Sequence, residues 1–99
     1  MVFSTFPDVQ TAKTIGRSLV EEQLAACVNV LPKIESIYRW KGKVEEAEEV
    51  LCLIKTTIGK YQALESRIKA LHPYEVPEIV AINLATGLPD YLNWVLQAC

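Results

Sequence analysis

The sequence predicts an α+β fold of the split βαβ, or ferredoxin-like, type, in which an antiparallel sheet carries two helices on one face. Two observations predict this fold. Residues 34–57 have the pattern of one long β-hairpin, and the elements follow the order strand, helix, strand, strand, helix, strand and terminal helix. No repeat or linker interrupts this order, so residues 1–99 are predicted to form a single domain.

The hairpin of residues 34–57 is the longest predicted element. Its first arm, residues 34–40, nearly alternates apolar with polar residues, and residues 50–54 form a continuous apolar run, a type usually covered on both faces. If residues 27–30 extend the first arm, each arm has roughly 10 to 14 residues and spans about 35 to 45 Å. A domain of this size has a radius of gyration of only about 13 Å. We therefore expect the arms to project beyond their own core and to pack on neighbouring copies of the chain.

The hairpin turn is predicted at residues 41–43, because Gly42 can adopt a positive φ between two apolar-patterned arms. Residues 44–51 are rich in helix formers, so a helix is the alternative there. A short helix with four glutamates and no basic partner at i+4 would be marginal in water. We therefore favour the strand.

The register of the hairpin depends on the length of its loop, which the sequence leaves open. A three-residue loop would place Arg39 opposite Glu45, as a favourable cross-strand pair. A two-residue loop would place Tyr38 opposite Glu45 instead.

The chain before the hairpin is predicted to form a strand and a helix. Val2–Phe6 alternates as a short strand that the next residue, a proline, ends, and Asp8 is a good N-cap. Apolar residues at helical spacing then predict an amphipathic helix over residues 9–23. Within the first hairpin arm, Pro32 predicts a bend or an edge bulge.

The chain after the hairpin is predicted to form a helix, a strand and a terminal helix. A threonine pair at residues 56–57 can cap the second helix, and Pro73 ends it. The predicted buried stripe of that helix consists of Tyr61, Leu64, Ile68 and Leu71. Residues 79–84 form an apolar run that predicts a buried strand, and Pro89 suits the first position of a third helix, Pro89–Ala98.

The composition excludes several functional classes. The net charge is −2, so the chain lacks the basic surface that nucleic acids or anionic membranes attract. No apolar run approaches the roughly 20 residues of a membrane helix, and the start has no basic region of a signal peptide, so a cytoplasmic location is expected. An apolar content of 51% is high for 99 residues and again indicates buried interfaces.

The three cysteines indicate neither a disulfide framework nor a thiolate zinc site, because their number is odd and no C-x-x-C spacing occurs. Cys27 and Cys52 lie in apolar runs and are predicted to be small core residues, whereas Cys99 is expected to be exposed at the end of the chain.

The only histidine, His72, is a candidate metal ligand together with Glu75 or Glu78, because imidazole suits copper, nickel and zinc and carboxylates complete the shell. The alternative is a histidine at a helix end that bonds the last carbonyl groups. One histidine and one carboxylate make an incomplete site, so a tight metal site would need ligands from a second chain.

Each of the other candidate residues also has a structural explanation that involves no ligand. Lys55 ends an apolar run and either extends to solvent or points into a cleft. Tyr38 and Trp40 line a ligand cleft or, as we favour, pack at an interface. The glutamates at residues 45–49 are expected to form a solvated edge. The sequence shows no catalytic triad and no phosphate-binding loop, so it does not favour an enzyme.

The chain resembles the CutA family, the divalent-cation tolerance proteins. Two matching motifs are specific: Tyr-x-Trp-x-Gly-Lys at residues 38–43 and His-Pro-Tyr-x-x-Pro-Glu at residues 72–78. Residues 7–8, 24–29 and 55–57 match as well, so the likeness runs almost from end to end.

This resemblance implies a homotrimer whose strands pair between subunits, similar in architecture to the nitrogen-regulatory PII signalling proteins, and a role in tolerance of divalent metals, copper above all. It also implies an inter-subunit cleft lined by Cys27, Tyr38, Trp40, Glu49, Lys55, His72, Tyr74 and Glu78. Some copper-binding members use a cysteine and two histidines. This chain has Ser4 and Leu71 at two of those positions and keeps only His72.

The expected function is therefore that of a non-enzymatic homotrimer that binds a divalent metal, most readily Cu(II), with no obligatory cofactor. Copies of His72 with Glu75, Glu78 or Cys27 from different subunits would supply the ligands. The alternatives are a PII-like trimer that binds a small molecule or an anion near Lys55, and a purely structural trimer. An enzyme that uses Lys55, Tyr38 or Cys27 is less favoured.

Overall fold

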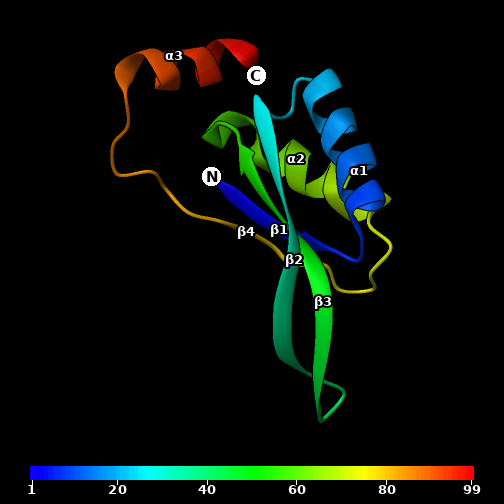
Figure 1. The fold of residues 1–99 in the computed structure, drawn as a ribbon. Coiled ribbons are helices and arrows are strands. Elements are labelled where there is room, and N and C mark those ends of the chain that lie inside the picture. Colours follow the sequence, from blue (N-terminus) through cyan, green and yellow to red (C-terminus); the bar gives the residue numbers. More distant parts are fainter.

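The long hairpin is the dominant element of the structure, a computed structural model that describes residues 1–99. It consists of strands β2 (Cys27–Trp40) and β3 (Lys43–Lys55), and its outer half projects beyond the rest of the protomer (Figure 1). The molecule measures 44 × 26 × 22 Å, so it is twice as long as it is thick. The extension of the first arm to Cys27 is confirmed, and so is the strand assignment of residues 44–51.

The hairpin closes with a two-residue loop, which settles the register. Tyr38 lies opposite Glu45, and Trp40 lies opposite Lys43. The loop residues Lys41 and Gly42 have φ angles of 49° and 80°. Positive φ at both central residues is the mark of a type I′ turn, whose twist matches that of the two strands.

The predicted irregularity at Pro32 is confirmed as a β-bulge. Leu31 pairs with Leu51, but the next pair is Ile34 with Glu49, so β2 has one residue more than β3 between them. Lys33, at the bulge, has a φ of 61°. Pro32 lacks an N–H group, and β2 accommodates it because this strand lies at an edge of the sheet.

The sheet has four strands in the order β2-β3-β1-β4, and all neighbouring strands are antiparallel. β1 (Val2–Phe6) lies between β3 and β4 (Ile79–Ala81), and helices α1 (Val9–Glu21) and α2 (Ile58–Leu71) cover one face (Figure 1). Helix α3 (Pro89–Ala98) lies apart from that pair, at the end of a long connection. The predicted order of elements is confirmed.

The hydrophobic core lies between the sheet and helices α1 and α2. Alternate residues of β1 and β3 point toward the helices: Val2, Phe6, Val50, Cys52 and Ile54. They pack on Ala12, Ile15, Leu19, Leu64 and Ile68. The prediction that Cys52 is a core residue is confirmed, and burial raises the pKa of its thiol to about 11, so this cysteine is unreactive at neutral pH.

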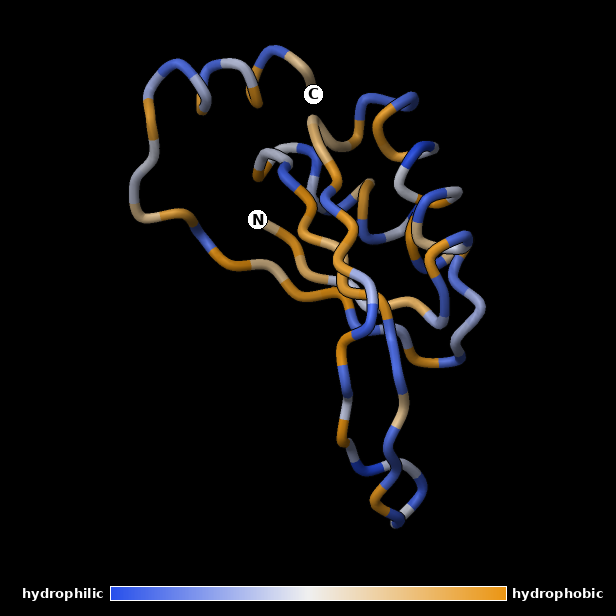
Figure 2. The backbone as a smooth tube through the Cα atoms, viewed as in Figure 1, coloured by the Kyte–Doolittle hydropathy of each residue, from blue (hydrophilic) through white to orange (hydrophobic).

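The opposite face of the sheet carries no helix of the protomer, and we call it the open face. Leu31, Leu51 and Leu53 lie on it, and Leu31 is exposed. Apolar stretches also follow β4 and the connection to α3 (Figure 2). Val80 is 52% exposed, so the prediction of a buried strand there is wrong for the protomer.

Two element boundaries and one predicted core position differ from the predictions. α1 ends at Glu21 rather than at residue 23, because Gln23 adopts a left-handed conformation with φ 59°. β4 ends at Ala81 rather than at residue 84, although Met1 and Ile82 still exchange two backbone hydrogen bonds, of 2.9 and 2.8 Å, beyond the last pair of the strands. In α2, Leu71 is 38% exposed and does not belong to the buried stripe.

None of the three helices is both long enough and apolar enough to cross a membrane.

Two of the three exposed glycines, Gly42 and Gly59, give a matched test of the turn. A Cβ atom would meet nothing within 4 Å at either position, but only Gly42 has a positive φ, of 80°. Gly42→Ala should therefore lower the free energy of unfolding by about 1 kcal/mol. Gly59→Ala, in the first turn of α2, should raise it by less than about 1 kcal/mol. Chemical denaturation of both variants measures the difference, and shifts of the same sign would refute the turn assignment.

The N-cap of α1 makes a second prediction, on pH. The Asp8 carboxylate accepts a hydrogen bond of 2.7 Å from the Thr11 N–H group, and this bond lowers the pKa of Asp8. A lowered pKa contributes stability above the unfolded-state value of about 3.9, and this contribution is lost as the pH falls through the folded-state value. Asp8→Ala should lower the melting temperature at neutral pH more than Asp8→Asn, which keeps an acceptor. The difference in melting temperature between the wild type and Asp8→Asn should shrink as the pH is lowered into the acid range. A difference that stays constant with pH would contradict this prediction.

Candidate functional site

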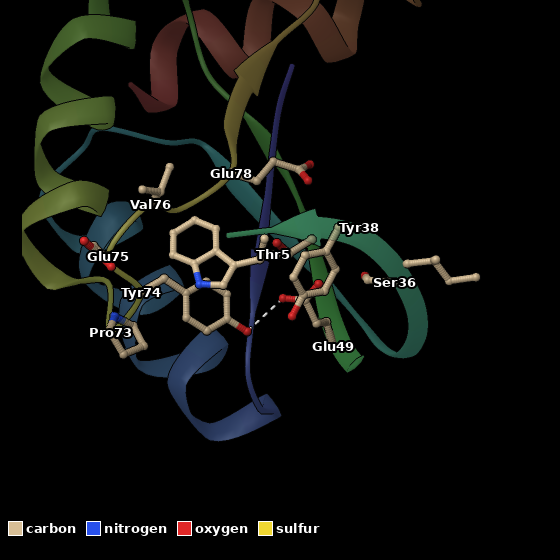
Figure 3. Close-up of a pocket in the computed structure, with 11 residues that line it drawn as sticks. Thr5, Ser36, Tyr38, Glu49, Pro73, Tyr74, Glu75, Val76 and Glu78 are labelled. Atoms are coloured by element: carbon tan, nitrogen blue, oxygen red, sulfur yellow. Dashed lines mark hydrogen bonds between the residues drawn. The ribbon is translucent and has the colours of Figure 1, made fainter. Parts of the chain in front are cut away.

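A cavity of about 640 Å³ lies where the projecting hairpin meets the segment between α2 and β4 (Figure 3). The hairpin contributes one wall and residues 73–78 contribute the other. The lining residues are Thr5, Ser36, Ile37, Tyr38, Trp40, Glu49, Pro73, Tyr74, Glu75, Val76 and Glu78.

The alternation of β2 places several of these side chains on one face. Ser36, Tyr38 and Trp40 follow each other at every second position beyond the bulge, so they share a face of the strand. Glu49 pairs with Ile34, two positions before Ser36 on β2, so the Glu49 side chain lies on this same face of the hairpin. The bulge at residue 33 bends β2 at this point, next to the cavity.

Tyr74 and Glu49 join the two walls. The Tyr74 hydroxyl donates a hydrogen bond of 2.8 Å to Glu49 Oε2 (Figure 3). Glu49 is only 9% exposed, so it does not belong to the solvated edge that we expected of the glutamates. Burial, and then the Glu49 carboxylate, raise the pKa of Tyr74 far above its ordinary value. Tyr74 therefore stays protonated and remains a hydrogen-bond donor at physiological pH.

His72 is buried behind Tyr74, and both of its ring nitrogens have backbone partners. Nδ1 accepts a hydrogen bond of 3.1 Å from the Tyr74 N–H group, which leaves Nε2–H to donate to the Thr5 carbonyl oxygen at 2.7 Å. The ring also stacks on Phe6, with ring centroids 4.7 Å apart. His72 thus fastens the start of the 72–78 segment to β1. The alternative considered for His72 is a structural histidine that bonds backbone carbonyl groups at a helix end. His72 does bond a backbone carbonyl group, but that group belongs to Thr5 and not to the last turn of α2.

The remaining predicted residues fall into two groups. Glu75 and Glu78 line the cavity and are exposed. Cys27 and Lys55 pair with each other at the far end of the hairpin, and Lys55 Nζ donates to Asn29 Oδ1. Since Lys55 is six residues along β3 from Glu49, the groups are separated by roughly 20 Å.

One protomer therefore does not assemble the predicted metal ligands. No group of three or more His, Cys, Asp or Glu side chains lies close enough together to hold a metal ion. His72 has no free nitrogen, and Cys27 lies at the other end of the open face. The structure does bring together six of the predicted residues around the cavity: Tyr38, Trp40, Glu49, Tyr74, Glu75 and Glu78.

Sequence reasoning missed two polar residues beside the predicted ones. Ser36 lines the cavity two positions before Tyr38, and Asn29 accepts from Lys55 two positions after Cys27. The two-residue period of a strand was the available signal for both. Cys27 is also only half-buried, so its prediction as a core residue is wrong, and Cys99 is half-buried beside Thr56 rather than exposed.

Comparison with known proteins identifies the group to which the chain is related. The family model described as "CutA1 divalent ion tolerance protein" matches residues 1–98. The divalent-cation tolerance protein CutA of Thermus thermophilus is 53% identical over 97 residues, which cover 98% of this chain and 94% of that protein. The human protein CutA is 50% identical over 95 residues, or 96% of this chain, and the chain spans about half of its length (53%). The same holds for the mouse protein, of which the chain spans 54%.

Solved structures show the same fold. The divalent cation tolerance protein of T. thermophilus has a TM-score of 0.93 at 53% identity, over 95% of this chain and 91% of that chain. CutA of Xylella fastidiosa has a TM-score of 0.95 at 47% identity, over 98% and 93%. A relative from Arabidopsis thaliana is named chloroplastic, and one from Archaeoglobus fulgidus periplasmic, so a cytoplasmic location stays a prediction for this chain. Sequence and fold agree throughout, and the chain belongs to the CutA1 divalent ion tolerance protein family.

Proposed function

We propose that this member of the divalent ion tolerance family works without catalysing a reaction, as a homotrimer that binds a divalent metal in clefts between its subunits. The observation that carries the proposal is the large apolar surface that the protomer leaves uncovered, next to a cavity lined by carboxylates. A surface of this kind marks an interface.

The apolar surface favours assembly with further copies of the chain. Exposed large apolar side chains occur on the hairpin, on β4 and on the connection to α3: Leu31, Ile37, Tyr38, Trp40, Val44, Val80, Ile82, Leu84 and Leu88. Strands β2 and β4 are the two edges of the sheet, so they can pair with strands of another copy. The resemblance to the CutA family favours three subunits.

The carboxylates of Glu75 and Glu78 are the best placed to receive a cation, because both are exposed beside the cavity. Two carboxylates with water as the remaining ligands make only a weak metal site, so a tight site needs donors from a second subunit. Cys27 is a candidate, since it lies at the far end of the open face. Among divalent first-row metals Cu(II) generally binds most tightly to a given set of donors, so copper is the first metal to test. In this geometry His72 positions the carboxylates, and it becomes a ligand only if its bond from Tyr74 breaks.

A PII-like binding function is the second candidate. The cavity of about 640 Å³ falls in the range of small-molecule sites, about 300 to 1,000 Å³. An enzyme is less supported, because Tyr38 and Cys27 are 11 residues apart on β2 and roughly 35 Å from each other.

Assembly can be tested with two exposed isoleucines. Ile37 on the hairpin is 71% exposed and Ile58 at the start of α2 is 87% exposed. Light scattering of the wild type should give about three times the protomer mass of 11.1 kDa. Ile37→Ala should make the free energy of association less favourable by about 2 kcal/mol per subunit, so that this variant dissociates at higher protein concentration than the wild type. Ile58→Ala should leave the free energy of association unchanged. A monomeric wild type, or equal behaviour of the two variants, would refute the proposed interface.

Metal binding can be tested by calorimetry with Cu(II) and Zn(II) on the assembled protein. The double variant Glu75→Gln, Glu78→Gln should weaken the affinity at least about tenfold, since it removes both charges while keeping the side-chain size. His72→Gln keeps an N–H donor for the Thr5 carbonyl and should change the affinity less than about threefold. A larger loss in His72→Gln than in the double variant would instead make His72 the ligand. Absence of saturable metal binding in the wild type would refute this part of the proposal.

A further inference from the structure

We infer that the cavity between the hairpin and the 73–78 segment binds a small organic cation with an alkylammonium group, seated between the aromatic rings of Tyr38, Trp40 and Tyr74 with its charge toward Glu49. This inference goes beyond the proposed metal binding, because it concerns another class of ligand and needs no coordination shell.

The charge of the lining selects a cation. Three carboxylates, those of Glu49, Glu75 and Glu78, line the cavity, and no lysine, arginine or histidine does. Among the lining side chains an anion would face like charges only, and Lys55, the cation considered for an anion site, lies roughly 20 Å away along β3. Glu49 contributes most to this selection, because at 9% exposure its charge is little screened by water.

The aromatic residues favour an organic cation over a hydrated metal ion. The faces of tryptophan and tyrosine rings attract ammonium groups, and sites for quaternary ammonium ligands are built from such rings. The Trp40 ring already attracts one cation in this protomer, since Lys41 Nζ lies 5.7 Å from the ring centroid. The cavity is also lined by Ile37, Pro73 and Val76, which suit methyl or methylene groups.

The site is held in place before any ligand arrives. The Tyr74 hydroxyl occupies Oε2 of Glu49, which leaves Oε1 for a ligand. The Tyr74 backbone is fixed in turn by His72 Nδ1, and His72 is fixed by Thr5 and Phe6. Pre-organisation of this kind reduces the free energy that binding spends on ordering side chains.

The test compares choline with its uncharged carbon analogue, 3,3-dimethylbutan-1-ol. The chain has two tryptophans, so Trp94→Phe leaves Trp40 as the only fluorescent tryptophan. In this variant, choline should change the Trp40 emission saturably, with a millimolar or tighter dissociation constant confirmed by calorimetry on the wild type. The neutral analogue should bind at least about tenfold more weakly, because it keeps the shape and loses the charge.

Two neighbouring glutamates give the matched variants. Glu49→Gln removes the buried charge while an amide oxygen can still accept from Tyr74, and it should weaken choline binding at least about tenfold. Glu48→Gln removes one negative charge from the neighbouring residue, whose side chain lies on the other face of β3. This variant should change the affinity for choline less than about twofold. Thermal unfolding verifies that both variants are folded. The comparison of choline with its neutral analogue by calorimetry uses the wild type, so it does not depend on either variant.

Three outcomes would overturn the inference. The first is equal binding of choline and its neutral analogue, and the second is an equal effect of the two glutamate variants on choline binding. The third is the absence of saturable choline binding, as expected if a second copy of the chain fills the cavity. The metal titrations are separate. A protein that binds Cu(II) but not choline refutes only this inference, and one that binds choline but no metal refutes only the proposed metal binding.

Discussion

The pairing of β2 with β3 decides which side chains share a surface, and the candidate site depends on it. The two-residue loop of Lys41 and Gly42 sets Tyr38 opposite Glu45, so the aromatic residues lie on the face of β2 that meets Glu49. A loop with one residue more would put Arg39 in that place and turn both aromatic rings to the other face. The composition of the cavity therefore originates in the φ angles of two exposed turn residues.

Two contacts between distant parts of the chain then complete the site. His72 reaches the Thr5 carbonyl across 67 residues of sequence, and Tyr74 reaches Glu49 across 25. Together they hold the 72–78 segment against the sheet while Glu75 and Glu78 stay exposed. This arrangement explains how the only histidine of the chain can lie beside several carboxylates without being free to bind a metal.

Sequence reasoning predicts those features that are set by local periodicity. The hairpin, α3 and the bulge at Pro32 follow from alternation, helical spacing and the missing N–H group of proline. It fails where the deciding partner is distant in sequence. β4 pairs with β1 over only three residues, fewer than its apolar run contains, and the partner of the His72 Nε2 atom is a carbonyl group of β1 that no local pattern reveals. The family resemblance groups Cys27 and Lys55 with the cavity residues in one cleft, but a single protomer holds only part of that set.

The outer half of β3 has β2 on one side and no strand on the other, because its pairing with β1 begins only at Val50. A newly synthesised protomer therefore presents a bare edge beside apolar side chains. Glu45, Glu46 and Glu48 are exposed along this edge. Their mutual repulsion opposes edge-to-edge stacking of unassembled chains, as gatekeeper charges do beside aggregation-prone strands. The glutamates that make this segment a poor strand by propensity thus protect the chain from aggregation for as long as its open face is uncovered.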